Sequence, residues 1–249
     1  MVNKIHNYDD VDSWKAVVFL YQAALKQMET KLEILNHEFQ DVHSYNPIEH
    51  TKTRLKTPES IVKKLKRNGH ETSIENMVKY VNDIAGVRII CSFTSDIYAL
   101  SEMIGNQSDI KVLSIKDYIR NPKPSGYKSY HMLVSIPVYL TDNVIETKVE
   151  IQIRTIAMDF WASLEHKIYY KFEGNAPAYI SRDLRECAEM VAKLDEKMLS
   201  LNTAIQECLE AEQDGEQNFR SEKVQEGIRQ HEKMLKTKLS LKDQEGYEA

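Results

Sequence analysis

The stretch that decides the fold is Lys148-Val-Glu-Ile-Gln-Ile-Arg-Thr155, in which polar and apolar residues alternate from Lys148 to Arg154. A period of two is typical of a β-strand that buries one of its faces. The apolar face carries Val149, Ile151 and Ile153, and the opposite face carries Glu150, Gln152 and Arg154. This polar face is either a solvent-exposed surface or the floor of a cleft, where a carboxylate could bind a metal ion and orient a hydroxyl group.

Further strands and several helices are expected around this stretch. β-branched runs predict strands at residues 87–93, 109–115 and 129–140. Apolar spacing and capping signals predict helices at residues 58–67, 73–83, 95–104 and 156–172. Strands and helices mixed in this way predict an α+β or α/β domain built around one sheet.

Long helices are expected on both sides of that domain. Apolar residues recur in steps of three and four over residues 10–40, and a heptad rhythm runs from Leu184 to Cys208. Beyond Asp214 the chain is polar and charged, and we expect a frayed helix or disorder there. We therefore divide the chain into an N-terminal helix, a central domain and a C-terminal helical oligomerisation region, at residues 1–45, 46–177 and 178–249.

Composition narrows the class of protein. No apolar stretch reaches the roughly 20 residues that a membrane span needs, and the N-terminus lacks the apolar region of a signal peptide. The three cysteines are widely spaced and form no CxxC pair, which favours a reducing cytoplasm. The formal net charge of −5 disfavours general RNA or DNA binding, because such binding depends on cations that meet phosphates.

Positive charge is nevertheless concentrated before and within the helix expected at residues 58–67. The cluster consists of Lys52, Arg54, Lys56, Lys63, Lys64, Lys66 and Arg67. Such a group of fixed cations could bind a polyphosphate. A solvated helix face is the commoner explanation of a charge run, but Arg54 and Lys56 share a face if their segment is extended, which favours a ligand.

Two other segments carry candidate site residues. Asp83 and Arg88 flank the sequence Ile-Ala-Gly-Val at an expected helix–strand joint, where Gly86 would permit a tight connection. Asp83 could hold Mg²⁺ and Arg88 could bind a base or phosphate, although for this pair taken alone a plain salt bridge is the favoured explanation.

The loop at residues 121–131 contains two prolines and a glycine and leads into a strand. It presents Tyr127, Lys128, Tyr130 and His131 close together. Tyr130 is expected to enter the core. Tyr127 follows a glycine at the end of the loop and is expected to offer an aromatic face to a base.

Four motifs in order, DIAGVR, SGYKSYH, EIQIRT and MDFWASLEHK, resemble the synthetase domain of the RelA/SpoT family. The last motif is most similar to the RelP-type small alarmone synthetases rather than the RelQ type. The resemblance implies a mixed, nucleotidyltransferase-like β-sheet packed by helices, and small members that form homotetramers. The His-Asp pair of the family's hydrolase domain has no match here.

The resemblance also implies roles on the ATP side. Arg54 and Arg88 would sandwich the adenine. Lys63 or Lys64, together with Lys56, would hold the phosphates.

On the acceptor side, the resemblance implies that Tyr127 stacks on guanine. Lys128 and His131 would approach the phosphates or ribose of GDP or GTP. Gln152 and Glu150 would orient the 3′-hydroxyl, and Glu150 could also act as a base.

The implied cofactor is Mg²⁺, bound by Asp83 and Glu150. The implied reaction transfers pyrophosphate from ATP to the 3′-hydroxyl of GDP or GTP and releases AMP. The alternative from another class is a nucleotide- or RNA-binding regulator on the same fold.

Overall fold

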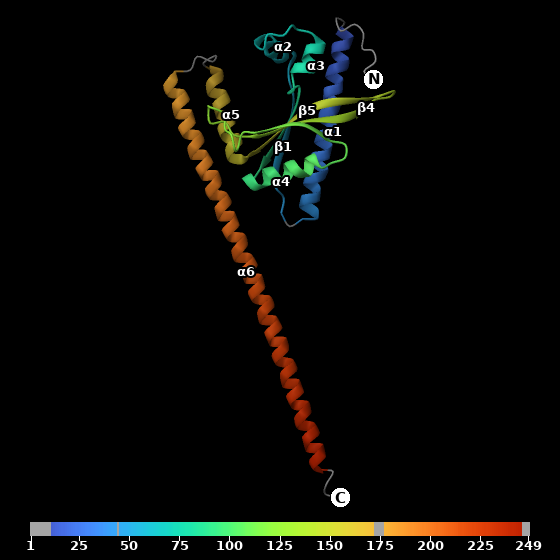
Figure 1. Cartoon of the computed structure of the whole chain (residues 1–249), viewed down its shortest axis with the longest axis vertical. Helices are drawn as coiled ribbons and strands as arrows, with labels where there is room; N and C mark the ends of the chain where they lie inside the picture. Colours follow the sequence, from blue (N-terminus) through green and yellow to red (C-terminus); the bar gives the residue numbers. More distant parts are fainter. Residues whose placement is uncertain (1–10, 44, 172–176, 246–249) are drawn as a thin grey trace. The chain divides into compact units, whose positions relative to one another are not determined.

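A mixed five-stranded sheet is built from residues 48–155 in the computed structural model, which describes residues 11–43, 45–171 and 177–245 (Figure 1). The strand order is β1-β2-β5-β4-β3. Strands β2 and β5 run parallel and the other neighbours run antiparallel, so the predicted mixed sheet is confirmed. The strands are β1 (Ile48–Leu55), β2 (Ala85–Cys91), β3 (Lys111–Asp117), β4 (Tyr130–Tyr139) and β5 (Val144–Thr155).

One face of the sheet is the hydrophobic core. Val149, Ile151 and Ile153 of β5 are fully buried, as their alternation predicts. The helices α1 (Val11–Asp41) and α4 (Thr94–Gly105) bury their apolar residues in the same core cluster as the sheet. The opposite face of the central strands is therefore left for the polar residues of the site.

Local signals placed most of the helices correctly. The helix α2 (Pro58–Arg67) has the predicted bounds, because the Thr57 side chain accepts a hydrogen bond from the Ser60 amide at 3.3 Å and Pro58 suits the first helical turn. The helix α3 (Ile74–Tyr80) is shorter than predicted. Asp83 therefore lies in the turn between α3 and β2 and does not end a helix.

Strand β1 was not predicted from the sequence pattern. Only Ile48 in this strand is buried. The strand pairs on one side only, with β2, and most of its residues are partly or fully exposed, so the sequence shows no apolar alternation.

Two further helices follow the sheet, α5 (Ile156–Lys171) and α6 (Ala178–Glu245). Residues up to Leu199 belong to a first compact unit and those from Ser200 onward to a second, which the structure describes as helical to Glu245. A frayed helix or disorder was expected after Asp214, and the structure describes the chain there as helical up to Glu245. None of the helices in the described residues has the length and apolar character that crossing a membrane demands.

The beginning of α6 packs beside α5 within the first unit (Figure 1). The indole nitrogen of Trp161 donates to the carbonyl oxygen of Leu184 at 2.9 Å, and the Thr155 hydroxyl donates to Asp195 at 2.7 Å. The predicted heptad seam is split by this packing: Leu184 is buried, whereas Leu194 is 59% exposed.

Candidate active site

A cleft of about 420 Å³ opens on the polar face of the sheet. Four cations and two carboxylates line it together with small and apolar groups. The lining residues are Lys52, Thr53, Arg54, Lys56, Asp83, Gly86, Val87, Arg88, Glu150 and Gln152. The structure therefore brings both predicted metal ligands and most of the predicted ATP-binding residues to one cleft.

Strand register explains this convergence. Lys52 of β1 lies opposite Arg88 of β2, Arg88 lies opposite Gln152 of β5, and Gln152 lies opposite His131 of β4. Residues that face each other across neighbouring strands point to the same side of a sheet. Four residues that are far apart in the chain thus form one row across the floor of the site.

Gly86 lies in the next row, between Arg54 and Glu150. The expectation that this glycine makes a tight joint was wrong, because its φ angle is not left-handed. An added Cβ would meet only the Arg54 carbonyl oxygen, at an ordinary 3.5 Å. The glycine instead leaves the space above the strands free between a cation and a carboxylate.

Asp83 is held by two lysines. Lys56 Nζ lies 2.9 Å from Oδ2 and Lys64 Nζ lies 2.7 Å from Oδ1. Burial by itself raises the pKa of Asp83, but the hydrogen bonds from Lys64 and Lys56 outweigh it, and the pKa is lowered overall. Because Arg88 pairs with Asp159 at 3.0 Å, the simple Asp83–Arg88 salt bridge considered above is not the arrangement found.

The acceptor side contains a closed ring of polar contacts. Arg154 Nη2 donates to the Tyr127 hydroxyl at 2.7 Å and to Gln152 Oε1 at 2.9 Å. The Tyr127 hydroxyl lies 2.9 Å from His131 Nε2, and His131 Nδ1 lies 3.6 Å from Glu150 Oε1. Gln152 Nε2 closes the ring by donating to Glu150 Oε2 at 2.8 Å.

The ring acts on the charge of Glu150. Burial raises the pKa of this carboxyl, and so does the charge of Asp83, but the contacts with His131 and Gln152 outweigh both and lower the pKa. A carboxylate with a lowered pKa is a good ligand for a cation and a weak proton acceptor. The lowered pKa therefore makes this carboxylate better suited to binding a cation than to accepting a proton.

The position of Tyr127 is fixed by packing against α5 and α6. Its ring packs against the small cluster formed by Trp161, Leu184 and Ala188 of α5 and α6. Lys123 Nζ lies 4.8 Å from the centroid of this ring, where its charge interacts with the aromatic face. Arg154 Cζ lies 5.2 Å from the same centroid, so two cations from different segments lie over this ring. Tyr130 is buried in the core, as predicted.

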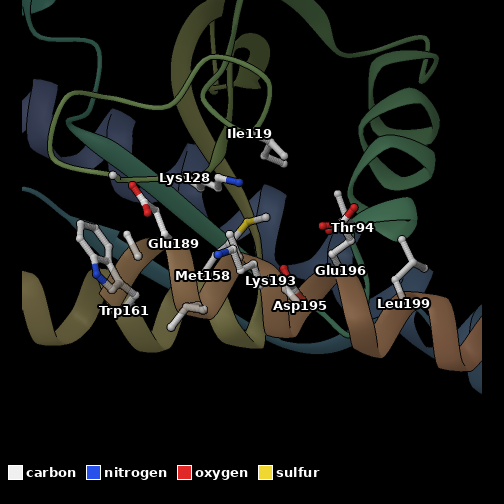
Figure 2. A pocket seen from close by; sticks show the side chains of 14 residues that line it. Thr94, Ile119, Lys128, Met158, Trp161, Glu189, Lys193, Asp195, Glu196 and Leu199 are labelled. Atoms are coloured by element: carbon white, nitrogen blue, oxygen red, sulfur yellow. The ribbon is translucent and has the colours of Figure 1, made fainter. Parts of the chain in front are cut away.

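Two of the predicted ligands line hollows other than this cleft. Lys63 lines a shallow surface hollow of α2 together with Pro58, Glu59, Val62 and Lys66. Lys128 lines a separate cavity of about 550 Å³ beside α6, where Glu189, Lys193 and Asp195 also lie (Figure 2). Among the predicted phosphate ligands, Lys56 lines the cleft itself and Lys64 reaches it by contacting Asp83.

Three further residues shape the site. Arg154 shares the polar face of β5, so the period-two pattern already pointed to it. Asp159 contacts both Arg88 and Arg154. Lys148 donates to the carbonyl oxygens of Val78 and Lys79 and thereby ties β5 to the end of α3. No local pattern could have revealed the last two roles, because the partners are distant in the sequence or on other elements.

The arrangement defines a class of protein. Fixed cations beside two carboxylates can hold a polyphosphate and neutralise its charge. The adjoining Tyr127 side chain and the ring of polar contacts around Glu150 can hold a second ligand that carries a hydroxyl group. This is the site of an enzyme that transfers phosphoryl groups between nucleotides.

Comparison with known proteins agrees with this class. The family described as "Region found in RelA / SpoT proteins" matches residues 53–175. GTP pyrophosphokinase YwaC of Bacillus subtilis (strain 168) is 49% identical over 195 residues, which cover 78% of this chain and 93% of that protein. The chain belongs to the RelA/SpoT family.

Solved structures of small family members share the fold. The small alarmone synthetase 2 of Bacillus subtilis is 49% identical, with a TM-score of 0.70 over 77% of this chain and 98% of that one. The small alarmone synthetase 1 of Bacillus subtilis, bound to its product pppGpp, is 34% identical, with a TM-score of 0.73 over 78% of this chain and 98% of that one.

Proposed function

We propose that this protein is a (p)ppGpp synthetase, which transfers the pyrophosphate of ATP to the 3′-hydroxyl of GDP or GTP and releases AMP. The observation that carries the proposal is that the cationic cleft and the ring of polar contacts from Tyr127 to Glu150 lie next to each other on one face of the sheet. The identity to a GTP pyrophosphokinase over most of both chains supports it.

ATP would occupy the cleft. Arg54 and Arg88 project from neighbouring strands and offer planar cations to the adenine ring. Lys56 and Lys64 already meet a carboxylate, and the same ammonium groups would meet the phosphates. Since Lys64 contacts Asp83 of the cleft and Lys63 lines the surface hollow of α2, we assign Lys64 rather than Lys63 to this role.

The guanine nucleotide would occupy the other side. Its base would stack on Tyr127, whose hydroxyl is fixed by Arg154 and His131. Gln152 and Glu150 would orient the 3′-hydroxyl. We place His131 close to the ribose and leave Lys128 out of direct contact, because it lines the cavity beside α6.

Asp83 and Glu150 suit Mg²⁺. Both line the same cleft and have a lowered pKa, which favours the ionised form, and the charge of Asp83 acts on Glu150 by raising its pKa. Within the described residues, no group of three or more histidine, cysteine or acidic residues could enclose a metal ion, and Mg²⁺ is commonly bound by one or two carboxylates plus substrate phosphates. When bound, Mg²⁺ would neutralise charge on the phosphates.

The transfer itself is a displacement at phosphorus. The 3′-oxygen attacks the β-phosphorus of ATP, the bond from that phosphorus to the α,β-bridging oxygen breaks, and AMP leaves. The hydroxyl proton passes to solvent. The residues act mainly by positioning two nucleotides and neutralising charge.

Assembly, subtype and location complete the proposal. Leu194, Met198 and Leu201 are large apolar residues exposed at heptad spacing, which supports association of copies through α6, with a tetramer as the proposed state. The MDFWASLEHK motif supports the RelP type, and the widely spaced cysteines support a cytoplasmic location.

The direct test uses ATP labelled on its γ-phosphate with GDP or GTP and Mg²⁺. We expect the label in a guanosine tetra- or pentaphosphate, with AMP formed in equal amount. Label recovered only in ATP or orthophosphate would refute the proposal and favour a binding role without transfer.

A further inference from the structure

Asp159 lies in the first turn of α5 and contacts both sides of the site. Its Oδ1 atom is 2.8 Å from Arg154 Nη1 and 3.0 Å from Arg88 Nη1. One carboxylate oxygen thus receives two guanidinium groups from different strands. The first turn of a helix favours a negative charge, which adds to the stability of this carboxylate.

The two arginines serve different subsites. Arg88 of β2 lines the cleft proposed for ATP. Arg154 of β5 is buried and fixes the Tyr127 hydroxyl and the Gln152 amide proposed for the acceptor. Asp159 is therefore the group through which the two subsites are joined by direct ionic contacts.

Electrostatics explain why the joint needs a carboxylate. Burial lowers the pKa of Arg88, and the charges of Arg154 and Arg54 lower it further, while Asp159 acts in the opposite direction. Arg88 Nε is buried and has no hydrogen-bond partner within the described residues, so no hydrogen bond compensates for the loss of its contact with water. The ion pair with Asp159 holds Arg88 there against its cationic neighbours.

We propose that Asp159 is a positioning residue that couples the ATP subsite to the guanine-nucleotide subsite through Arg88 and Arg154. The inference rests on the proposed function, because it takes the two subsites from it. In this proposal, Arg88 moves when ATP binds, which changes its ion pair with Asp159. The altered position of Asp159 changes its ion pair with Arg154, and thereby the hydrogen bond from Arg154 to Tyr127. A purely structural ion pair would stabilise the fold without this selective effect.

The test measures binding by calorimetry. The probes are GDP and an ATP analogue with a methylene bridge between the α- and β-phosphates, which cannot release AMP. We expect Asp159→Asn to weaken the analogue about tenfold, as for the loss of one charged hydrogen bond, and to weaken GDP less. Asp183→Asn is the matched control, since it removes an exposed carboxylate that pairs with Arg182.

Two readouts separate positioning from stability. On an Arg88→Gln background, Asp159→Asn should cause little further loss of analogue affinity, because its effect acts through Arg88. In the wild type, saturating GDP should change the affinity for the analogue by a measurable factor, and this factor should move toward one in Asp159→Asn.

Additive effects of Arg88→Gln and Asp159→Asn, or a factor of one in the wild type, would overturn the inference. Should Asp159→Asn fail to fold, Asp159→Glu is measured in the same cycle, where non-additivity supports coupling and additivity overturns it. Failure of the proposed function has a different signature, namely a folded wild type that forms no labelled guanosine tetra- or pentaphosphate.

Discussion

The donor side and the acceptor side of the site are held in different ways. On the donor side, Lys56, which directly follows β1, and Lys64 of α2 reach Asp83 and form ion pairs within an open cleft. On the acceptor side, Tyr127, His131 and Glu150 are fixed in a ring of contacts that Gln152 and the buried Arg154 close.

The difference indicates how each side meets its ligand. Lysine ammonium groups on flexible stems can exchange a carboxylate for a phosphate without a change in the sheet. A ring of polar contacts between buried and half-buried groups restrains its members and orients them before a ligand arrives. We therefore expect donor-side changes to act mainly on affinity for ATP, and acceptor-side changes to act on orientation and on the guanine nucleotide.

Glu150→Gln should have the largest effect, because Glu150 belongs to the ring and also faces the cleft. The substitution keeps the shape of the side chain and removes the charge that would bind Mg²⁺. We expect kcat for AMP release to fall by about 10²–10³-fold, with ATP affinity little changed. Turnover at the wild-type rate would show that Glu150 has no part in the mechanism, and the ring of polar contacts would then have no demonstrated catalytic role.

Tyr127→Ala should weaken the guanine nucleotide by roughly 10- to 100-fold, because a stacking platform is lost, and should leave ATP affinity nearly unchanged. Tyr127→Phe keeps the ring and removes the hydroxyl that meets Arg154 and His131. It should spare guanine affinity but lower kcat. Equal losses of both nucleotides in a binding assay would erase the distinction between the two sides.

Lys56→Met should weaken ATP about tenfold in KM, since one charged contact to the phosphates is lost, with a smaller change for GDP. Lys66→Met provides the control, because this lysine also belongs to the basic cluster but lines the surface hollow of α2 and not the cleft. Equal effects of the two substitutions would mean that ATP responds to the general charge of the cluster.

The pH dependence of stability should reveal the Asp83 contacts. Because Lys64 and Lys56 lower the pKa of Asp83 below its ordinary 3.8, its contribution to the free energy of unfolding is complete above about pH 4. It is lost as the pH falls through the lowered value. The stability difference between wild type and Asp83→Asn, measured by urea unfolding, should therefore shrink toward zero in acid. A difference that stays constant down to pH 2 would contradict this account.

Replacing Leu194 and Leu201 by lysine should affect chemistry least, because neither residue lines the cleft or belongs to the ring of contacts. Both are exposed in the single chain and lie seven residues apart on α6. We expect dissociation of the assembly, seen as a lower mass by light scattering, because two charges enter an apolar seam. Glu196→Lys is a control on the same helix, and an unchanged mass for the leucine variant would refute the seam.

Local patterns in the sequence identified the strands and helices whose packing follows the rules of periodicity. The alternation around Glu150 predicted both the buried and the polar face of β5, and Pro58 predicted the start of α2. The same reasoning did not count β1, because an edge strand with partly exposed residues needs no apolar alternation. It also placed Asp83 at a helix end, since it could not detect that α3 stops at Tyr80.

The sequence by itself determined the residue types of the site and their order along the chain: a cation cluster, an acid before a strand, an aromatic loop and a polar strand face. The tertiary structure decided which of them meet. Strand order and register joined Lys52, Arg88, Gln152 and His131 in one row, turned Lys128 into another cavity, and brought Asp159 to two arginines. The physical reason is that periodicity is a local property, whereas contacts across a sheet depend on how distant strands pair.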